Sequence, residues 1–145
     1  AADEFTRRFV EAAGERQYGD PGERGTTLAP MARADLRDEL HKQVQASVAK
    51  GARVLVGGEP IAGTHAGYPA TVLDQVGPGM PAYDEELFGP VASILRVKDD
   101  AEAVRVANDV SVLTSNSMTP EARVVATSMA ANAASSVRLC SSTTA

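Results

Sequence analysis

The chain has 145 residues, a formal net charge of −5 and a single cysteine. This length suits one domain with its own core. The negative charge argues against nucleic acid or an anionic membrane as the main partner, and no apolar run approaches the roughly 20 residues that span a bilayer. One cysteine excludes an internal disulfide framework and is typical of the reducing cytoplasm, where we expect the protein to reside.

The first third of the chain is predicted to form two amphipathic helices. Apolar residues recur every four positions at Phe5, Phe9 and Ala13, which indicates a helix over 3–16. Glycine and proline punctuate residues 18–30, so regular structure is not expected there. A second helix is predicted over 31–50, with Pro30 near its first turn and Gly51 ending it. Its apolar ridge consists of Leu36, Leu40, Val44 and Val48.

Short apolar runs then alternate with turns and one further helix. Strands are predicted over 53–56, 71–73 and 91–97, each bounded by glycine or proline. Asp99 and Glu102 have the spacing of a capping box for a helix that ends near Asn108, with Val104 and Ala107 facing inward. Helices that alternate with short strands indicate the α/β class, and we expect mostly parallel strands.

The stretch from Tyr83 to Val91 carries the most chemistry. It reads Tyr-Asp-Glu-Glu-Leu-Phe-Gly-Pro-Val and leads through a turn into the third strand. Its pattern alone predicts an exposed acidic loop with Phe88 buried in the core. The alternative is a ligand contact, because a carboxylate can accept hydrogen bonds from sugar hydroxyls and an aromatic ring can lie against a flat ring.

Other reactive residues favour plain structural roles. His41 is predicted to be a partly exposed helix histidine, and His65 an inert loop residue, since no partners at metal-ligand spacing accompany them. Glu85 and Glu86 are adjacent in an extended loop and therefore point opposite ways, so they do not form a catalytic pair on one substrate. Cys140 has no nearby His or Glu in sequence and is interpreted as an ordinary thiol.

Several motifs together resemble the aldehyde dehydrogenase superfamily. The run from Glu85 to Val91 resembles the family signature E-E-[IL]-F-G-P-V. The flanking motifs fall in the family's order; they are residues 18–21, 28–32, 50–53, 56–58, 68–73, 78–80 and 107–109. Pro30-Met31-Ala32-Arg33, followed by the segment 35–41, is similar to the bacterial succinate-semialdehyde dehydrogenases.

The resemblance implies a part of the catalytic domain of an NAD- or NADP-dependent enzyme. Glu86 matches the glutamate that binds the nicotinamide ribose hydroxyls, and Phe88 matches the phenylalanine that packs at the nicotinamide. The family's catalytic cysteine, base and oxyanion residues precede this segment, so no catalytic residue and no metal site is expected within it. The whole enzyme would oxidise an aldehyde, succinate semialdehyde by the closest resemblance, to its acid.

The resemblance also implies limits. It is close over about residues 3–109 and loose over the rest. Residues 1–109 are predicted to be a segment of the catalytic domain, and residues 110–145 a divergent or truncated continuation of the same domain. This segment alone is expected to be inactive, and the complete enzyme to be a homo-oligomer that acts on a small aldehyde without a nucleic-acid or membrane partner. The alternative function is a non-catalytic remnant that acts through protein contacts.

Overall fold

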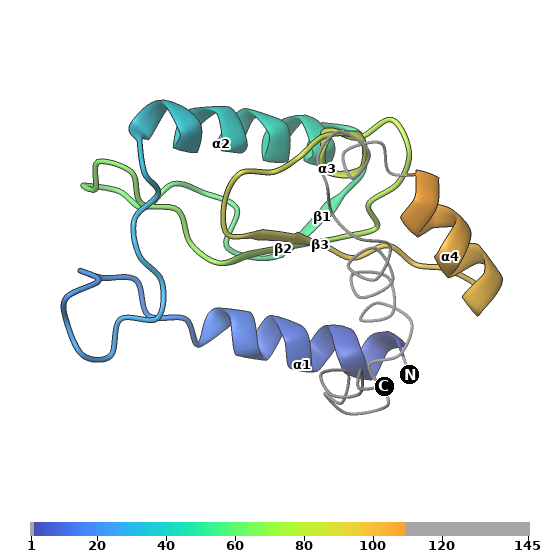
Figure 1. The fold of residues 1–145 in the computed structure, drawn as a ribbon, viewed down its shortest axis with the longest axis horizontal. Coiled ribbons are helices and arrows are strands. Elements are labelled where there is room, and N and C mark those ends of the chain that lie inside the picture. Colours follow the sequence, from blue (N-terminus) through green and yellow to red (C-terminus); the bar gives the residue numbers. More distant parts are fainter. Residues whose placement is uncertain (1, 110–145) are drawn as a thin grey trace, which may run out of the picture.

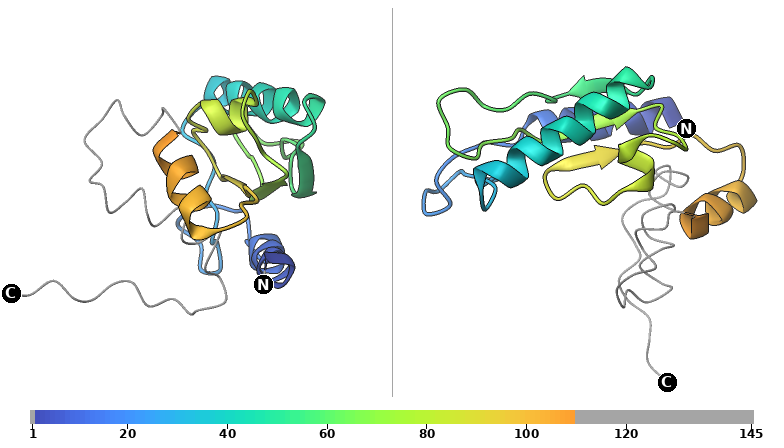
Figure 2. Two further views of the ribbon diagram at one scale, coloured as in Figure 1. Left: turned by 90° about the vertical axis from the view of Figure 1, so that its right-hand side faces the viewer. Right: turned by 90° about the horizontal axis from the view of Figure 1, so that it is seen from above.

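The computed structural model describes residues 2–109, and two helices sandwich a small sheet (Figure 1). Helix α1 (Ala2–Gly14) lies along one face and helix α2 (Ala34–Ala49) along the other. The turned views in Figure 2 show the same layers. The expected α/β class is confirmed. The predicted elements beyond residue 109 and Cys140 lie outside the described residues, and the division at residue 109 stays a prediction.

The sheet has three strands in the order β1-β2-β3: β1 (Arg53–Val56), β2 (Thr71–Asp74) and β3 (Val91–Ser93). β2 pairs antiparallel with β1 and parallel with β3, so the strands are not mostly parallel as expected. The two connections, residues 57–70 and 75–90, are similar in length, but the second crosses over the face of the sheet that α2 covers, as a parallel pair requires.

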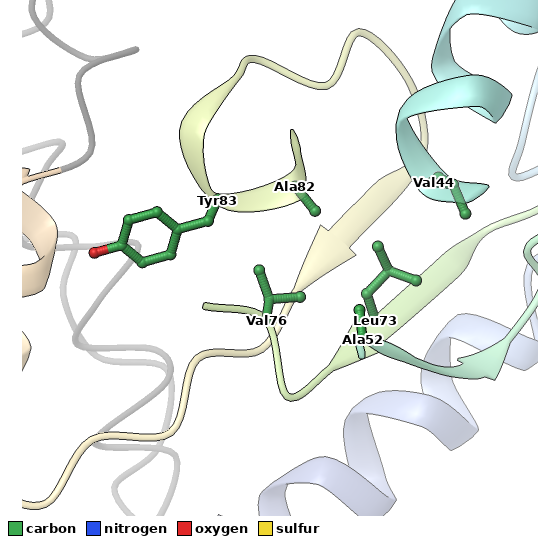
Figure 3. Packing of buried hydrophobic residues seen from close by; sticks show 6 residues of the cluster. All are labelled: Val44, Ala52, Leu73, Val76, Ala82 and Tyr83. Atoms are coloured by element: carbon green, nitrogen blue, oxygen red, sulfur yellow. The ribbon is translucent and has the colours of Figure 1, made fainter. Parts of the chain in front are cut away.

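The core lies between the sheet and α2. All four residues of β2 are buried, and Leu73 packs in one cluster with Val44 of α2. Figure 3 shows this cluster, in which the ring of Tyr83 points away from Val44 and Leu73. Leu40 is also buried, but Leu36 and Val48 at the two ends of the predicted ridge are exposed. The packing of α2 therefore depends on its middle turns.

Helix α1 is held differently, because none of its residues is buried. The rings of Phe5 and Phe9 stack with centroids 5.5 Å apart, which confirms the predicted stripe. Arg96, which follows β3, donates to Asp3 of α1 at 2.9 Å. The same guanidinium binds both carboxylate oxygens of buried Asp74, at 3.1 and 2.9 Å. Arg96 thus links α1 to the central strand.

Three predicted boundaries were wrong in detail. Helix α2 begins after an N-cap at Arg33, so Pro30 lies before the helix and not in its first turn. β3 ends at Ser93 instead of residue 97, although Ile94 still donates to the carbonyl of Leu73 at 2.7 Å. A one-turn helix α3 (Pro81–Asp84) forms where only a turn was expected.

Helix α4 (Asp100–Asp109) follows the predicted cap. The Asp99 carboxylate accepts from the backbone of Glu102 at 2.8 Å, and the Glu102 carboxylate accepts from the backbone of Lys98. Val104 was expected to face inward but is 54% exposed. Ala103 and Ala107 are buried, so the inward face of α4 contains Ala103 in place of Val104.

Candidate functional site

The signature stretch lies along α2 and is fixed to it at three points. The backbone N–H of Ala82 donates to the Ser47 hydroxyl at 2.9 Å. Further along, the Gln43 amide donates to the Glu85 carboxylate at 2.8 Å. These contacts run backwards along the helix as the chain runs forwards, so segment 82–89 lies antiparallel to α2, beginning with α3 (Figure 1).

Gly89 makes the third contact. A Cβ added to Gly89 would overlap the Cδ2 atom of Leu40 and lie 3.2 Å from the Cε atom of Met31. Only glycine allows this backbone to come so close to the helix. The following residue, Pro90, accepts a hydrogen bond from the backbone of Thr71 at 2.8 Å. The segment is therefore fixed at both ends, to α2 and to β2.

Glu86 and Phe88 project away from this packed surface. Leu87 between them packs against the core cluster, whereas Glu86 is exposed and Phe88 is 65% exposed. The backbone N–H of Gly89 donates to the carbonyl of Leu87 at 3.0 Å, so the chain turns tightly at Phe88 and both side chains stay exposed on either side of Leu87. The prediction that Phe88 fills the core was wrong, because Leu87 takes the inward position.

The two adjacent glutamates have different surroundings. Gln43 holds the Glu85 carboxylate and also donates to the backbone oxygen of Glu86 at 3.3 Å. Within the part of the chain that the structure describes, the Glu86 carboxylate makes no hydrogen bond or ion pair. Its oxygens can accept hydrogen bonds from a ligand without losing a protein partner. That the two carboxylates do not act together on one substrate stays a prediction.

A second polar group joins α2 to the loop between β1 and β2. Tyr68 is fully buried, and its hydroxyl donates to the carbonyl of Gly58 at 3.1 Å. Because the Tyr68 hydroxyl hydrogen is used in the bond to Gly58, Nδ1 of His41, which lies 3.2 Å from the Tyr68 oxygen, must be the donor in their contact. Nε2 of His41 faces the Glu59 carboxylate at 3.5 Å. Burial, and secondly the charge of Glu59, raise the pKa of Tyr68 to about 12.

This group has the character of a structural contact. Every polar atom of Tyr68 and His41 is directed at a protein partner, and the imidazole lies on a helix, partly exposed, as predicted. His65 is exposed, also as predicted.

Among residues 2–109, no three His, Cys, Asp or Glu side chains are grouped so that they could hold a metal ion. No helix in the same residues is both long and apolar enough to cross a membrane.

Sequence reasoning missed Gln43 and Ser47. Ser47 follows Leu40 and Val44 at helical spacing, so its place on the buried face of α2 was readable from the pattern. Gln43 carried no such signal, because its partners lie 42 and 43 residues further along the chain. A contact between such distant residues becomes visible only when the fold is known.

The signature segment thus presents a carboxylate with no partner in the described chain and an exposed ring, packed on an α/β layer. The model of the aldehyde dehydrogenase family matches residues 1–138. The chain belongs to this family.

Named relatives agree with this assignment. The succinate semialdehyde dehydrogenase [NAD(P)+] Sad of Escherichia coli K12 is 54% identical over 108 residues, 74% of this chain and 23% of that protein. A salicylaldehyde dehydrogenase of Pseudomonas sp. strain C18 is 40% identical over 109 residues, 74% of this chain and 22% of that protein. The chain therefore spans less than a third of the length of these relatives.

Solved structures show the same fold. The succinate-semialdehyde dehydrogenase of Burkholderia pseudomallei superposes with a TM-score of 0.72 at 30% identity, over 88% of this chain and 27% of that one. The lactaldehyde dehydrogenase of Escherichia coli superposes with a TM-score of 0.70 at 35% identity, over 74% of this chain and 23% of that one.

Proposed function

We propose that the native protein containing this chain is an NAD(P)-dependent dehydrogenase that oxidises an aldehyde, most specifically succinate semialdehyde, to its carboxylic acid. The support for the substrate is the 54% identity to an enzyme named for it. A relative named for salicylaldehyde lies lower, at 40% identity.

Within this activity, the segment described here would bind the nicotinamide end of the cofactor. The observation that carries the proposal is the pair of exposed side chains on a fixed loop, with the Glu86 carboxylate unpartnered in the described chain and Phe88 65% exposed. Glu86 would accept hydrogen bonds from the ribose hydroxyls, and Phe88 would pack against the ring system. The bound cofactor supplies the hydride acceptor.

Aldehyde oxidation also needs a thiolate nucleophile, oxyanion donors and a base for water. No residue described here matches those roles, so we propose that they come from a part of the native protein outside this chain. The chain alone should then show no turnover. We further propose a cytoplasmic homo-oligomer. The alternative of a non-catalytic remnant is not favoured, since the relatives described above are named as dehydrogenases.

The test is cofactor binding and turnover by the native protein with Glu86→Gln and Phe88→Ala. Losing a charged acceptor should weaken NAD(P) binding by about tenfold. The KM for the aldehyde should change little, because neither side chain is assigned to it. Unchanged cofactor affinity in both variants would contradict the proposed site, and absence of aldehyde oxidation by the unaltered protein would contradict the activity.

A further inference from the structure

One side chain on α2 contacts both adjacent glutamates of segment 82–89. The Gln43 amide nitrogen donates to the Glu85 carboxylate at 2.8 Å and to the Glu86 backbone oxygen at 3.3 Å. An amide nitrogen carries two hydrogens, so these two contacts use its whole donor capacity. Both donor hydrogens of Gln43 are therefore directed at the two residues that precede Leu87.

These contacts have different effects on the two carboxylates. Glu85 is held against α2, whereas Glu86 is held only by its backbone, and its carboxylate stays available. Without the amide, the Glu85 carboxylate would be free to rotate, and two like charges on adjacent residues would repel each other. Gln43 thus fixes the position from which the Glu86 side chain projects.

We propose that Gln43 is a positioning residue for cofactor binding, which acts through Glu86 without touching the cofactor. This inference rests on the proposed role of Glu86. It assigns to α2 a function beyond packing, because a helix residue determines how the signature segment presents its carboxylate to the nicotinamide ribose.

Gln43 is not needed to hold the segment to the helix. Ser47 on one side and Leu40 on the other already fix the ends of segment 82–89, and both are buried. Gln43 itself is only partly buried. Gln43→Leu keeps the size of the side chain and removes its donors, so the fold should survive the change. Gln45→Leu is the matched control, because Gln45 is exposed on the same helix and has no partner within residues 2–109.

The experiment measures the binding of three probes to the native protein by titration calorimetry. The probes are NAD(P), ADP-ribose and AMP; ADP-ribose keeps the second ribose but lacks nicotinamide, and AMP lacks both. Gln43→Leu should weaken NAD(P) and ADP-ribose by about fivefold, the effect of one net hydrogen bond. It should leave AMP unchanged, as should Gln45→Leu for all three probes. In a Glu86→Gln background, Gln43→Leu should have no further effect.

The outcomes separate the two proposals. If Glu86→Gln weakens ADP-ribose but Gln43→Leu does not, the positioning role is wrong and the proposed site stands. If Glu86→Gln has no effect, the proposed site fails, and the positioning role fails with it. Equal weakening of all three probes by Gln43→Leu, with a lower melting temperature, would show a structural role only and would also overturn the inference.

Discussion

Gly89 and Leu40 lie in direct contact, so that the signature segment touches α2 through bare backbone. Leu40 is buried and cannot move aside freely. Gly89→Ala should therefore destabilise the protein by about 1–3 kcal/mol through overpacking. Thermal or denaturant unfolding measures the change. The control is Gly77→Ala, since an added Cβ at Gly77 meets no atom within 4 Å. Equal stability of the two variants would contradict the contact.

Ser47 satisfies two backbone groups at once. Its hydroxyl donates to the carbonyl of Gln43 at 2.8 Å and accepts from the N–H of Ala82 at 2.9 Å. Ser47→Ala leaves the buried N–H of Ala82 without a partner, which should cost about 2 kcal/mol in unfolding free energy. Ser93→Ala is the comparison, because its hydroxyl donates to the carbonyl of the same Ala82 in a less buried place. Its cost should be the smaller of the two.

Tyr68 should lose stability when its hydroxyl is removed. Tyr68→Phe deprives the carbonyl of Gly58 of its donor and Nδ1 of His41 of its acceptor, and we expect a loss of about 1–2 kcal/mol. Tyr18→Phe is the matched control, because the Tyr18 hydroxyl makes no hydrogen bond within the described residues. Chemical denaturation of both variants measures the difference. A Tyr18→Phe loss as large as that of Tyr68→Phe would refute the assignment.

Asp74 gives the protein a stability that depends on pH. The paired Arg96 guanidinium lowers the pKa of Asp74 below its ordinary value. The folded chain therefore binds this proton less tightly than the unfolded chain. The pair stabilises the fold above the ordinary aspartate pKa, and this contribution is lost as the pH falls through that value towards the lowered one.

Asp74→Asn tests this dependence. The variant should lose about 2 kcal/mol near pH 7, and its difference from the unaltered protein should shrink as the pH falls below about 4. Asp3→Asn removes the other partner of Arg96. The Asp3 side chain is 92% exposed. Its cost should stay below about 0.5 kcal/mol. Denaturation midpoints recorded across this pH range give both values, and a constant difference for Asp74→Asn would disprove the linkage.

The helices were the most predictable part of the fold. Periodic apolar residues located α1 and α2, because each helix packs one stripe and the stripe is local in sequence. The three strands were located, but the antiparallel pairing of β1 with β2 was not expected, since pairing depends on how the intervening chain returns. β3 is shorter than its apolar run, although Ile94 beyond it still donates to the carbonyl of Leu73 at 2.7 Å.

The candidate site was only partly predictable from residue types. An aromatic residue after two glutamates is consistent with a core position or with a ligand contact, and the choice between Leu87 and Phe88 for the interior depends on where α2 lies. The structure puts Leu87 against the core and leaves Phe88 exposed. Whether Glu86 and Phe88 bind cofactor stays a prediction that the binding experiments decide.

Arg96 also has a consequence for the order of folding. It joins Asp3 to a position 93 residues later, and Asp74 to a position 22 residues later. Closing the longer loop costs more chain entropy, and no residue of α1 is buried to offset that cost. We therefore expect α1 to dock after the sheet and α2 have formed. Asp3→Asn should then speed unfolding and leave the folding rate unchanged.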